Sequence, residues 1–262
     1  MKLGFCGKGG VGKTTLASLV VRHLAAAGKD VVAIDADPVP NLQAALGFPM
    51  DVVPRPVADL KELIEERTGA KKGGWGTFFR MNPTVADLPE RLGLSRDNIR
   101  LLVMGTVDKG GSGCVCPESI VLKALVRHLL LAPDQVVVMD MEAGVEHLGR
   151  GSSAALDRLV AVVDPGQRSH VAARRIRALA ADIGLAAPAV VLNNVRDPED
   201  VARVRDSLHD FELLGHLPFD PTVARADRDG AMPYAELSLA PAALAEIVRQ
   251  LVSASRPAPA PT

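Results

Sequence analysis

Short apolar runs alternate along the chain with longer amphipathic stretches. The runs are rich in Val, Leu and Ile, which is typical of strands that are buried on both faces of a sheet. The amphipathic stretches carry apolar residues at helical spacing. This alternation predicts an α/β fold: a doubly wound, mostly parallel sheet of about seven strands, with helices on both faces.

The same pattern places the individual elements. We expect strands at residues 2–6, 31–34, 101–104, 136–139, 159–163, 190–193 and 213–217. We expect helices at residues 14–27, 119–131, 169–183, 198–209 and 241–252. Gly28, Gly184 and Gly215 stand where the chain is expected to break between elements.

Residues 51–97 depart from this rhythm, because four prolines interrupt them and three glycines surround Trp75. Proline and glycine disfavour long regular elements. We therefore expect a single domain over residues 1–255, with an insertion of helices and loops at about 51–97. At residues 256–262 Pro alternates with Ala, which predicts a disordered tail.

Composition narrows the function classes. Lys and Arg number 30 against 31 Asp and Glu, so the chain has no overall charge to draw it to nucleic acid or to an anionic membrane, and we expect neither partner. No apolar run approaches the roughly 20 residues of a membrane-spanning helix, and the first apolar stretch is too short for a signal peptide. Three cysteines argue against a disulfide framework. We expect a cytoplasmic protein.

Residues 7–14 match the phosphate-loop pattern G-x-x-x-x-G-K-[ST] and lie between a predicted strand and a predicted helix. The glycines let backbone N–H groups approach an anion, and Lys13 can reach the β and γ phosphates. We expect the Thr14 hydroxyl to hold Mg²⁺ and Thr15 to lie near the α phosphate. The loop therefore predicts an ATP site formed by Gly7, Lys8, Gly9, Gly10, Val11, Gly12, Lys13, Thr14 and Thr15.

Lys8 is a second lysine that the phosphate-loop mechanism does not require. With it, residues 8–15 read KGGVGKTT, which resembles the deviant Walker A signature of the family that contains MinD, ParA, nitrogenase iron protein and the CooC-type metallochaperones. In that family the early lysine crosses the dimer interface to the partner's phosphates. The resemblance implies a homodimer around two ATP molecules and an ATPase in which Lys8 and Lys13 are catalytic.

Acidic residues follow two of the predicted strands, at the sheet edge where doubly wound folds bind ligands. Asp140 ends an apolar run as a Walker B aspartate does and is expected to contact Mg²⁺ through water. The resemblance implies that Asp37 is catalytic and orients the attacking water, while Asp35 supports the magnesium shell. Glu142 and Gly144 follow as a second switch that senses the γ phosphate. A strand-end Asp also serves as a helix cap, so each assignment depends on the neighbouring phosphate loop.

A weaker signal concerns the adenine ring. Asn193 follows an apolar run and matches the family position that hydrogen-bonds adenine. Pro218 and Asp220 lie in a segment, LPFDP, that matches the loop beside the ring. A strand-end Asn is also a common cap or turn residue, and that alternative stays open.

Cys114 and Cys116 lie in the segment GGSGCVCP. In an extended backbone, residues two apart project to the same side, so both thiolates can face one ion. A tetrahedral thiolate site needs four ligands, and a twofold dimer supplies this pair twice. The pair predicts a metal ion that bridges two subunits, with Ni²⁺ and Zn²⁺ both suited to thiolates. The alternative is a pair of reduced, inert thiols in a loop.

The segment GCVCP, together with residues 140–151, resembles the CooC-type nickel-insertion ATPases of carbon monoxide dehydrogenase, and the resemblance covers nearly the whole chain. It implies an ATP-hydrolysing metallochaperone that binds nickel at a dimer interface. It also implies carbon monoxide dehydrogenase as the client that receives the nickel.

Two other functions stay open. A positioning or partition ATPase of the MinD and ParA type needs a membrane-binding helix or a DNA surface, but the apolar stripe of residues 241–252 is accompanied by one basic residue, which favours core packing. An iron–sulfur reductase like nitrogenase iron protein takes its cysteines from separate segments. Here only Cys6 is distant from the pair, and we expect it to be a small core residue.

Overall fold

A computed structural model describes residues 1–70, 80–105, 117–132, 135–142, 156–223, 225 and 241–253. Its strands form one sheet in the order β3-β4-β2-β5-β1-β6-β7-β8. Every pairing is parallel except that of β3 with β4, at one edge. The strands are β1 (Lys2–Gly7), β2 (Val31–Ala36), β3 (Leu94–Arg96), β4 (Ile99–Val103), β5 (Val136–Met141), β6 (Arg158–Val163), β7 (Ala189–Val195) and β8 (Leu213–Pro218). The predicted fold class is confirmed.

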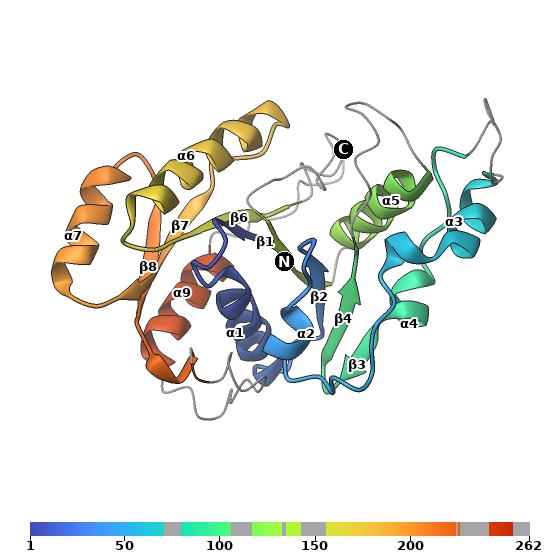
Figure 1. The fold of residues 1–262 in the computed structure, drawn as a ribbon, viewed down its shortest axis with the longest axis horizontal. Helices are drawn as coiled ribbons and strands as arrows, with labels where there is room; N and C mark the ends of the chain where they lie inside the picture. The colour runs from blue at the N-terminus through green and yellow to red at the C-terminus, as the bar shows by residue number, and fades with distance from the viewer. Residues whose placement is uncertain are drawn as a thin grey trace.

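Helices cover both faces of this sheet (Figure 1). One face carries α1 (Lys13–Ala26), α2 (Leu42–Ala45) and α9 (Pro241–Ser253). The other carries η1 (Val57–Asp59), α3 (Lys61–Thr68), α4 (Leu88–Leu92), α5 (Pro117–Leu131), α6 (Gln167–Asp182) and α7 (Pro198–Ser207). Each face has its own apolar core, which explains why the strands read as continuous apolar runs. All five predicted helices are present, to within a few residues.

Strand alternation decides which side chains reach the α1 face. Ala33 of β2 and Val138 of β5 belong to the core on that face. Because side chains two apart share a face, Asp35 and Asp140 point to the same side. The two are directly opposite each other in the β2–β5 pairing. The fold therefore brings two predicted acidic residues together in front of the start of α1.

The strand β3 was not predicted. It has three residues, two of them exposed, and it pairs antiparallel with β4 through Leu94 and Leu101. So short a strand has no apolar run of its own, and pairing with an edge strand forms it. The expected insertion at 51–97 contains β3, η1, α3 and α4. The predicted tail at 256–262 lies outside the described residues.

Two of the three glycines do end helices. Gly28 and Gly184 follow α1 and α6, each with a φ of 78° in the left-handed region. The prediction for Gly215 was wrong, because this residue lies inside β8. A Cβ atom there would lie 2.8 Å from Cγ1 of Ile247. Gly215 thus lets α9 pack closely on β8 instead of ending an element.

In the part of the chain that the structure describes, every helix is too short or too polar to cross a membrane.

Candidate nucleotide site

The phosphate loop lies between β1 and α1, as predicted. Gly10 and Gly12 have φ angles of 83° and 88°, which residues with a side chain rarely adopt. Val11 between them is fully buried and anchors the loop to the core on the α1 face. Gly12 then caps α1, so the N-terminus of a 14-residue helix stands directly behind the loop.

Lys13 is the point on which the predicted acidic residues converge. Its Nζ lies 2.5 Å from Oδ2 of Asp37 and 3.8 Å from Oδ1 of Asp140. Burial lowers the pKa of Lys13, but the Asp140 and Asp37 carboxylates outweigh it and leave the pKa raised. The ammonium group is therefore charged and lies between two carboxylates.

Asp140 is fully buried, and among the described residues neither of its oxygens has a hydrogen-bond partner. Burial raises its pKa to about 7, although the Lys13 charge and the nearby Thr14 side chain both lower it. A buried carboxylate that lacks a close hydrogen bond is costly, and a cation relieves that cost. Mg²⁺ prefers oxygen ligands and keeps water and phosphate in its shell. Asp140 and Thr14 therefore fit the residues that would hold Mg²⁺.

Asp35 has a different environment. Its oxygens accept hydrogen bonds from the backbone N–H of Asp37 at 3.2 Å and of Leu42 at 2.8 Å. Burial raises its pKa, and these two bonds oppose the rise. Asp35 thus holds the backbone that carries Asp37, while Oδ1 of Asp37 accepts from the Val39 N–H at 3.0 Å. Its contribution to a magnesium shell stays a prediction.

Within the described ranges, no three His, Cys, Asp or Glu side chains are arranged to hold a metal ion.

The residues assigned to adenine lie at the carboxyl ends of β7 and β8. Asn193 is nearly buried, and its Nδ2 donates to the Val11 carbonyl at 2.9 Å. Pro218 ends β8, and Oδ1 of Asp220 accepts from the Thr222 backbone N–H at 2.8 Å and hydroxyl at 2.6 Å. Asp220 is thus a turn cap, and its adenine role and those of Asn193 and Pro218 stay predictions.

Two contacts in this region were missed from the sequence. The Arg196 guanidinium stacks 3.7 Å above the ring of Phe219, and Asn193 contacts the phosphate loop. The residues of each contact are far apart in the sequence, so no local spacing predicts the contact. The one available signal was the single aromatic residue inside the segment LPFDP.

Other predicted residues are placed less fully. Lys8 lies on the loop, where its carbonyl accepts from the Val11 N–H at 3.3 Å, and its reach into a partner stays a prediction. Glu142 is exposed directly after β5. Gly144, Cys114 and Cys116 lie outside the described residues.

Cys6 is fully buried in β1, with its thiol donating to the Val160 carbonyl at 3.4 Å. Burial raises its pKa to about 12. It is therefore a protonated core residue, as predicted, and a poor ligand for an iron–sulfur cluster.

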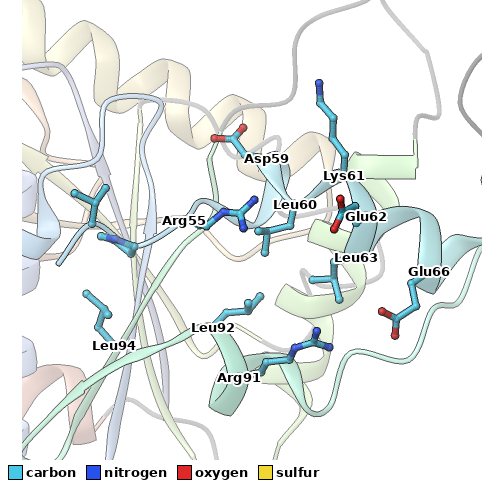
Figure 2. Close-up of a pocket in the computed structure, with 12 residues that line it drawn as sticks. Arg55, Asp59, Leu60, Lys61, Glu62, Leu63, Glu66, Arg91, Leu92 and Leu94 are labelled. Atoms are coloured by element: carbon cyan, nitrogen blue, oxygen red, sulfur yellow. The ribbon is translucent and has the colours of Figure 1, made fainter.

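A separate hollow of about 720 Å³ lies in the insertion, between η1 with α3 and α4 with β3 (Figure 2). Leucine side chains line it together with both acidic and basic groups, which include Arg55, Asp59 and Arg91. None of the predicted nucleotide-site residues lines this hollow.

Comparison with known proteins places the chain. The CobQ/CobB/MinD/ParA nucleotide binding domain matches residues 5–234. The carbon monoxide dehydrogenase accessory protein CooC of Rhodospirillum rubrum is 43% identical over 236 residues, which cover 89% of each chain. An ATP-binding protein of Methanocaldococcus jannaschii is 43% identical over 230 residues, which cover 87% of this chain and 88% of the relative. The solved structure of MinD from Aquifex aeolicus aligns with a TM-score of 0.67 at 20% identity, over 98% of this chain and 99% of that one, which is a likeness of fold.

Proposed function

The chain is an ATPase of the CobQ/CobB/MinD/ParA nucleotide-binding family, of the CooC type, and from this premise we propose that it is a nickel metallochaperone. In this function a homodimer binds ATP and Mg²⁺, and hydrolysis promotes the insertion of nickel into carbon monoxide dehydrogenase in the cytoplasm. The observation that carries the proposal is the 43% identity with the accessory protein CooC, over 89% of both chains.

The nucleotide half of the proposal follows from the charges around Lys13. The phosphates of ATP compete with Asp37 for the ammonium group, because both are anions and Asp37 lies only 2.5 Å away. Bound Mg²⁺ neutralises charge that develops on the phosphates. Lys13 then binds the β and γ phosphates, and Asp37 is released to orient water. The nucleotide thereby changes the position of a residue that the dimer needs for hydrolysis.

The metal half assigns the cargo to Cys114 and Cys116. Two thiolates from each subunit of a homodimer supply the four ligands that a shared metal site needs. Cys6 offers no alternative ligand, because it is buried and protonated. Zn²⁺ is expected to compete with Ni²⁺ for the same thiolates. ATP binding and metal binding are then coupled through the dimer, and the coupling is reciprocal.

The positioning-ATPase alternative requires a membrane-binding helix or a DNA-binding surface, and α9 does not provide the membrane-binding helix. Its apolar stripe is buried against the sheet and α1, and Val252 is the exposed large apolar residue of this helix. The residues of the buried stripe are Leu244, Ile247, Val248 and Leu251. The likeness to solved MinD structures at 20% identity concerns the fold alone.

The test is an anaerobic titration with Ni²⁺ and with Zn²⁺, with and without ATP, alongside molecular mass. We expect one ion per dimer in the wild type, an affinity that ATP changes, and loss of binding in Cys114→Ala/Cys116→Ala. Cys6→Ala is the matched control and should keep the site. Equal metal affinity with and without ATP contradicts the coupling. Metal binding that is unchanged in Cys114→Ala/Cys116→Ala would favour the alternative of a positioning or partition ATPase of the MinD and ParA type.

A further inference from the structure

One side chain of β7 holds the phosphate loop from a distant part of the sequence. Nδ2 of Asn193 donates to the Val11 carbonyl at 2.9 Å, across 182 residues, and the bond is buried. In the sheet, β6 separates β7 from β1, the strand that leads into the loop. The contact therefore ties the loop to a strand with which β1 does not pair.

The backbone of Gly12 lies directly against the same amide. A Cβ atom at Gly12 would lie 2.2 Å from Nδ2 of Asn193, closer than any real contact allows. Gly12 also has a φ of 88°, a left-handed conformation that glycine adopts at little cost. A side chain at position 12 is therefore excluded for two reasons: it would clash with Asn193, and it would disfavour the backbone conformation.

This hydrogen bond fixes the direction of a whole peptide group. The Val11 carbonyl and the Gly12 N–H belong to one planar trans peptide, so they point in opposite directions. Because the carbonyl is held towards Asn193, the Gly12 N–H is directed away from it. Backbone N–H groups of this kind of loop bind phosphate oxygens. A rotated peptide would present its carbonyl oxygen instead, and glycine on one side makes such a rotation easy.

We propose that Asn193 is a positioning residue for the phosphate loop: its amide holds the Val11–Gly12 peptide in the orientation that binds polyphosphate, whatever the base. The proposal rests on the nucleotide site proposed above and gives Asn193 a role beyond an adenine contact. The two roles make different demands. A base contact affects ATP and leaves a bare polyphosphate untouched, whereas a loop contact affects both.

The test compares the binding of ATP and of tripolyphosphate, each with Mg²⁺, by calorimetry. In Asn193→Ala both affinities should fall by the same factor, about five- to tenfold, because a buried carbonyl loses its donor. Asn194→Gly is the control: it removes the neighbouring amide at a residue whose φ of 61° suits glycine. Its affinities should stay within about twofold of the wild type, as expected away from a specific contact.

Hydrogen exchange gives a second measurement that needs no ligand. Amides of residues 9–14 should exchange faster in nucleotide-free Asn193→Ala than in the wild type, and Asn194→Gly should leave them unchanged. If Asn193→Ala fails to fold, Asn193→Asp keeps the size of the side chain, removes the donor and serves for the exchange measurement.

Each remaining outcome is decisive. Weaker ATP binding with unchanged tripolyphosphate binding and unchanged exchange overturns the proposal and leaves Asn193 as a base contact. Unchanged affinities for both ligands overturn it as well. A wild type that binds neither ligand defeats the proposed nucleotide site, while the exchange measurement still reports on the contact between Asn193 and the loop.

Discussion

Two ion pairs of nearly equal length join separate segments of this chain. Lys13 and Asp37 lie 2.5 Å apart at the phosphate loop, and Arg67 and Asp87 lie 2.6 Å apart in the insertion. The side chains of Lys13 and Asp37 are 10% and 17% exposed, and they lie beside Asp140, whose buried oxygens have no close hydrogen bond among the described residues. In the insertion, the side chain of Asp87 is 48% exposed, and two nitrogens of Arg67 donate to its carboxylate. Length alone does not separate the pairs. The two pairs differ in their surroundings, because Lys13 and Asp37 lie beside the buried carboxyl group of Asp140.

The largest expected effect comes from removing the cation of the buried pair. Lys13→Ala should lower the ATP turnover by about a hundred- to a thousandfold, because it removes a preorganised charge that faces the phosphates. Steady-state phosphate release measures it. Arg67→Ala is the matched control and should leave turnover per folded molecule unchanged. A Lys13→Ala protein that keeps a tenth of its activity contradicts the assignment.

Next in size is a change in the insertion that should affect folding and leave the chemistry intact. Leu63 lines the hollow in Figure 2 and belongs to the core beneath it. Leu63→Ala should lower the free energy of unfolding by about 2–3 kcal/mol, measured in urea, because it leaves a cavity. Val53→Ala, at an exposed position of the same hollow, should change it by less than about 0.5 kcal/mol. A loss of turnover in folded Leu63→Ala would show that the hollow and the nucleotide site are coupled.

The third prediction concerns pH, in nucleotide-free protein with Mg²⁺ chelated. The pKa of Asp140 is about 7 in the folded protein, against an ordinary 3.8, so the folded state binds the proton more tightly. Stability contributed by this group is therefore lost as pH rises from about 4 to 7. Asp140→Asn removes that loss, and at pH 8 it should be more stable than the wild type by on the order of 4 kcal/mol, because each unit of the pKa shift corresponds to about 1.4 kcal/mol. Denaturation curves with the same pH dependence in both proteins contradict this.

The smallest effect sharpens the comparison of the two pairs. Asp37→Asn frees Lys13 from a competing anion, so the affinity for ATP should rise about fivefold, which corresponds to about 1 kcal/mol. Asp87→Asn breaks the exposed pair and should leave this affinity unchanged. Calorimetry with both variants measures the difference. Equal responses would mean that the two pairs do not differ in function.

The sequence predicted the parts of the site that local pattern controls. Asp35 and Asp140 each end an apolar run, and in a parallel sheet the carboxyl ends of strands meet at one edge. The position of Asp140 beside Lys13, with Asp35 directly opposite Asp140, follows from that rule and from strand alternation.

Features that depend on distant packing were not visible in the sequence. Gly215 resembles a chain break until Ile247 is seen to pack against it. The hydrogen bond from Asn193 to Val11 joins residues that no spacing rule connects. The strand β3 forms by pairing with β4, and its own sequence does not predict it. The prediction for Cys114 and Cys116 still rests on the sequence and on the similarity to CooC.

The two oxygens of Asp37 accept hydrogen bonds from different parts of the chain, so the carboxylate links the phosphate loop to the segment after β2. One oxygen holds the Lys13 ammonium, and the other holds the backbone N–H of Val39, whose side chain is 68% exposed. Because both oxygens belong to one rigid, planar carboxylate, a rotation that releases Lys13 also shifts the oxygen that holds Val39. We therefore expect a phosphate that binds Lys13 to disturb both contacts of Asp37 and to shift the backbone at Val39, an exposed apolar residue on the surface.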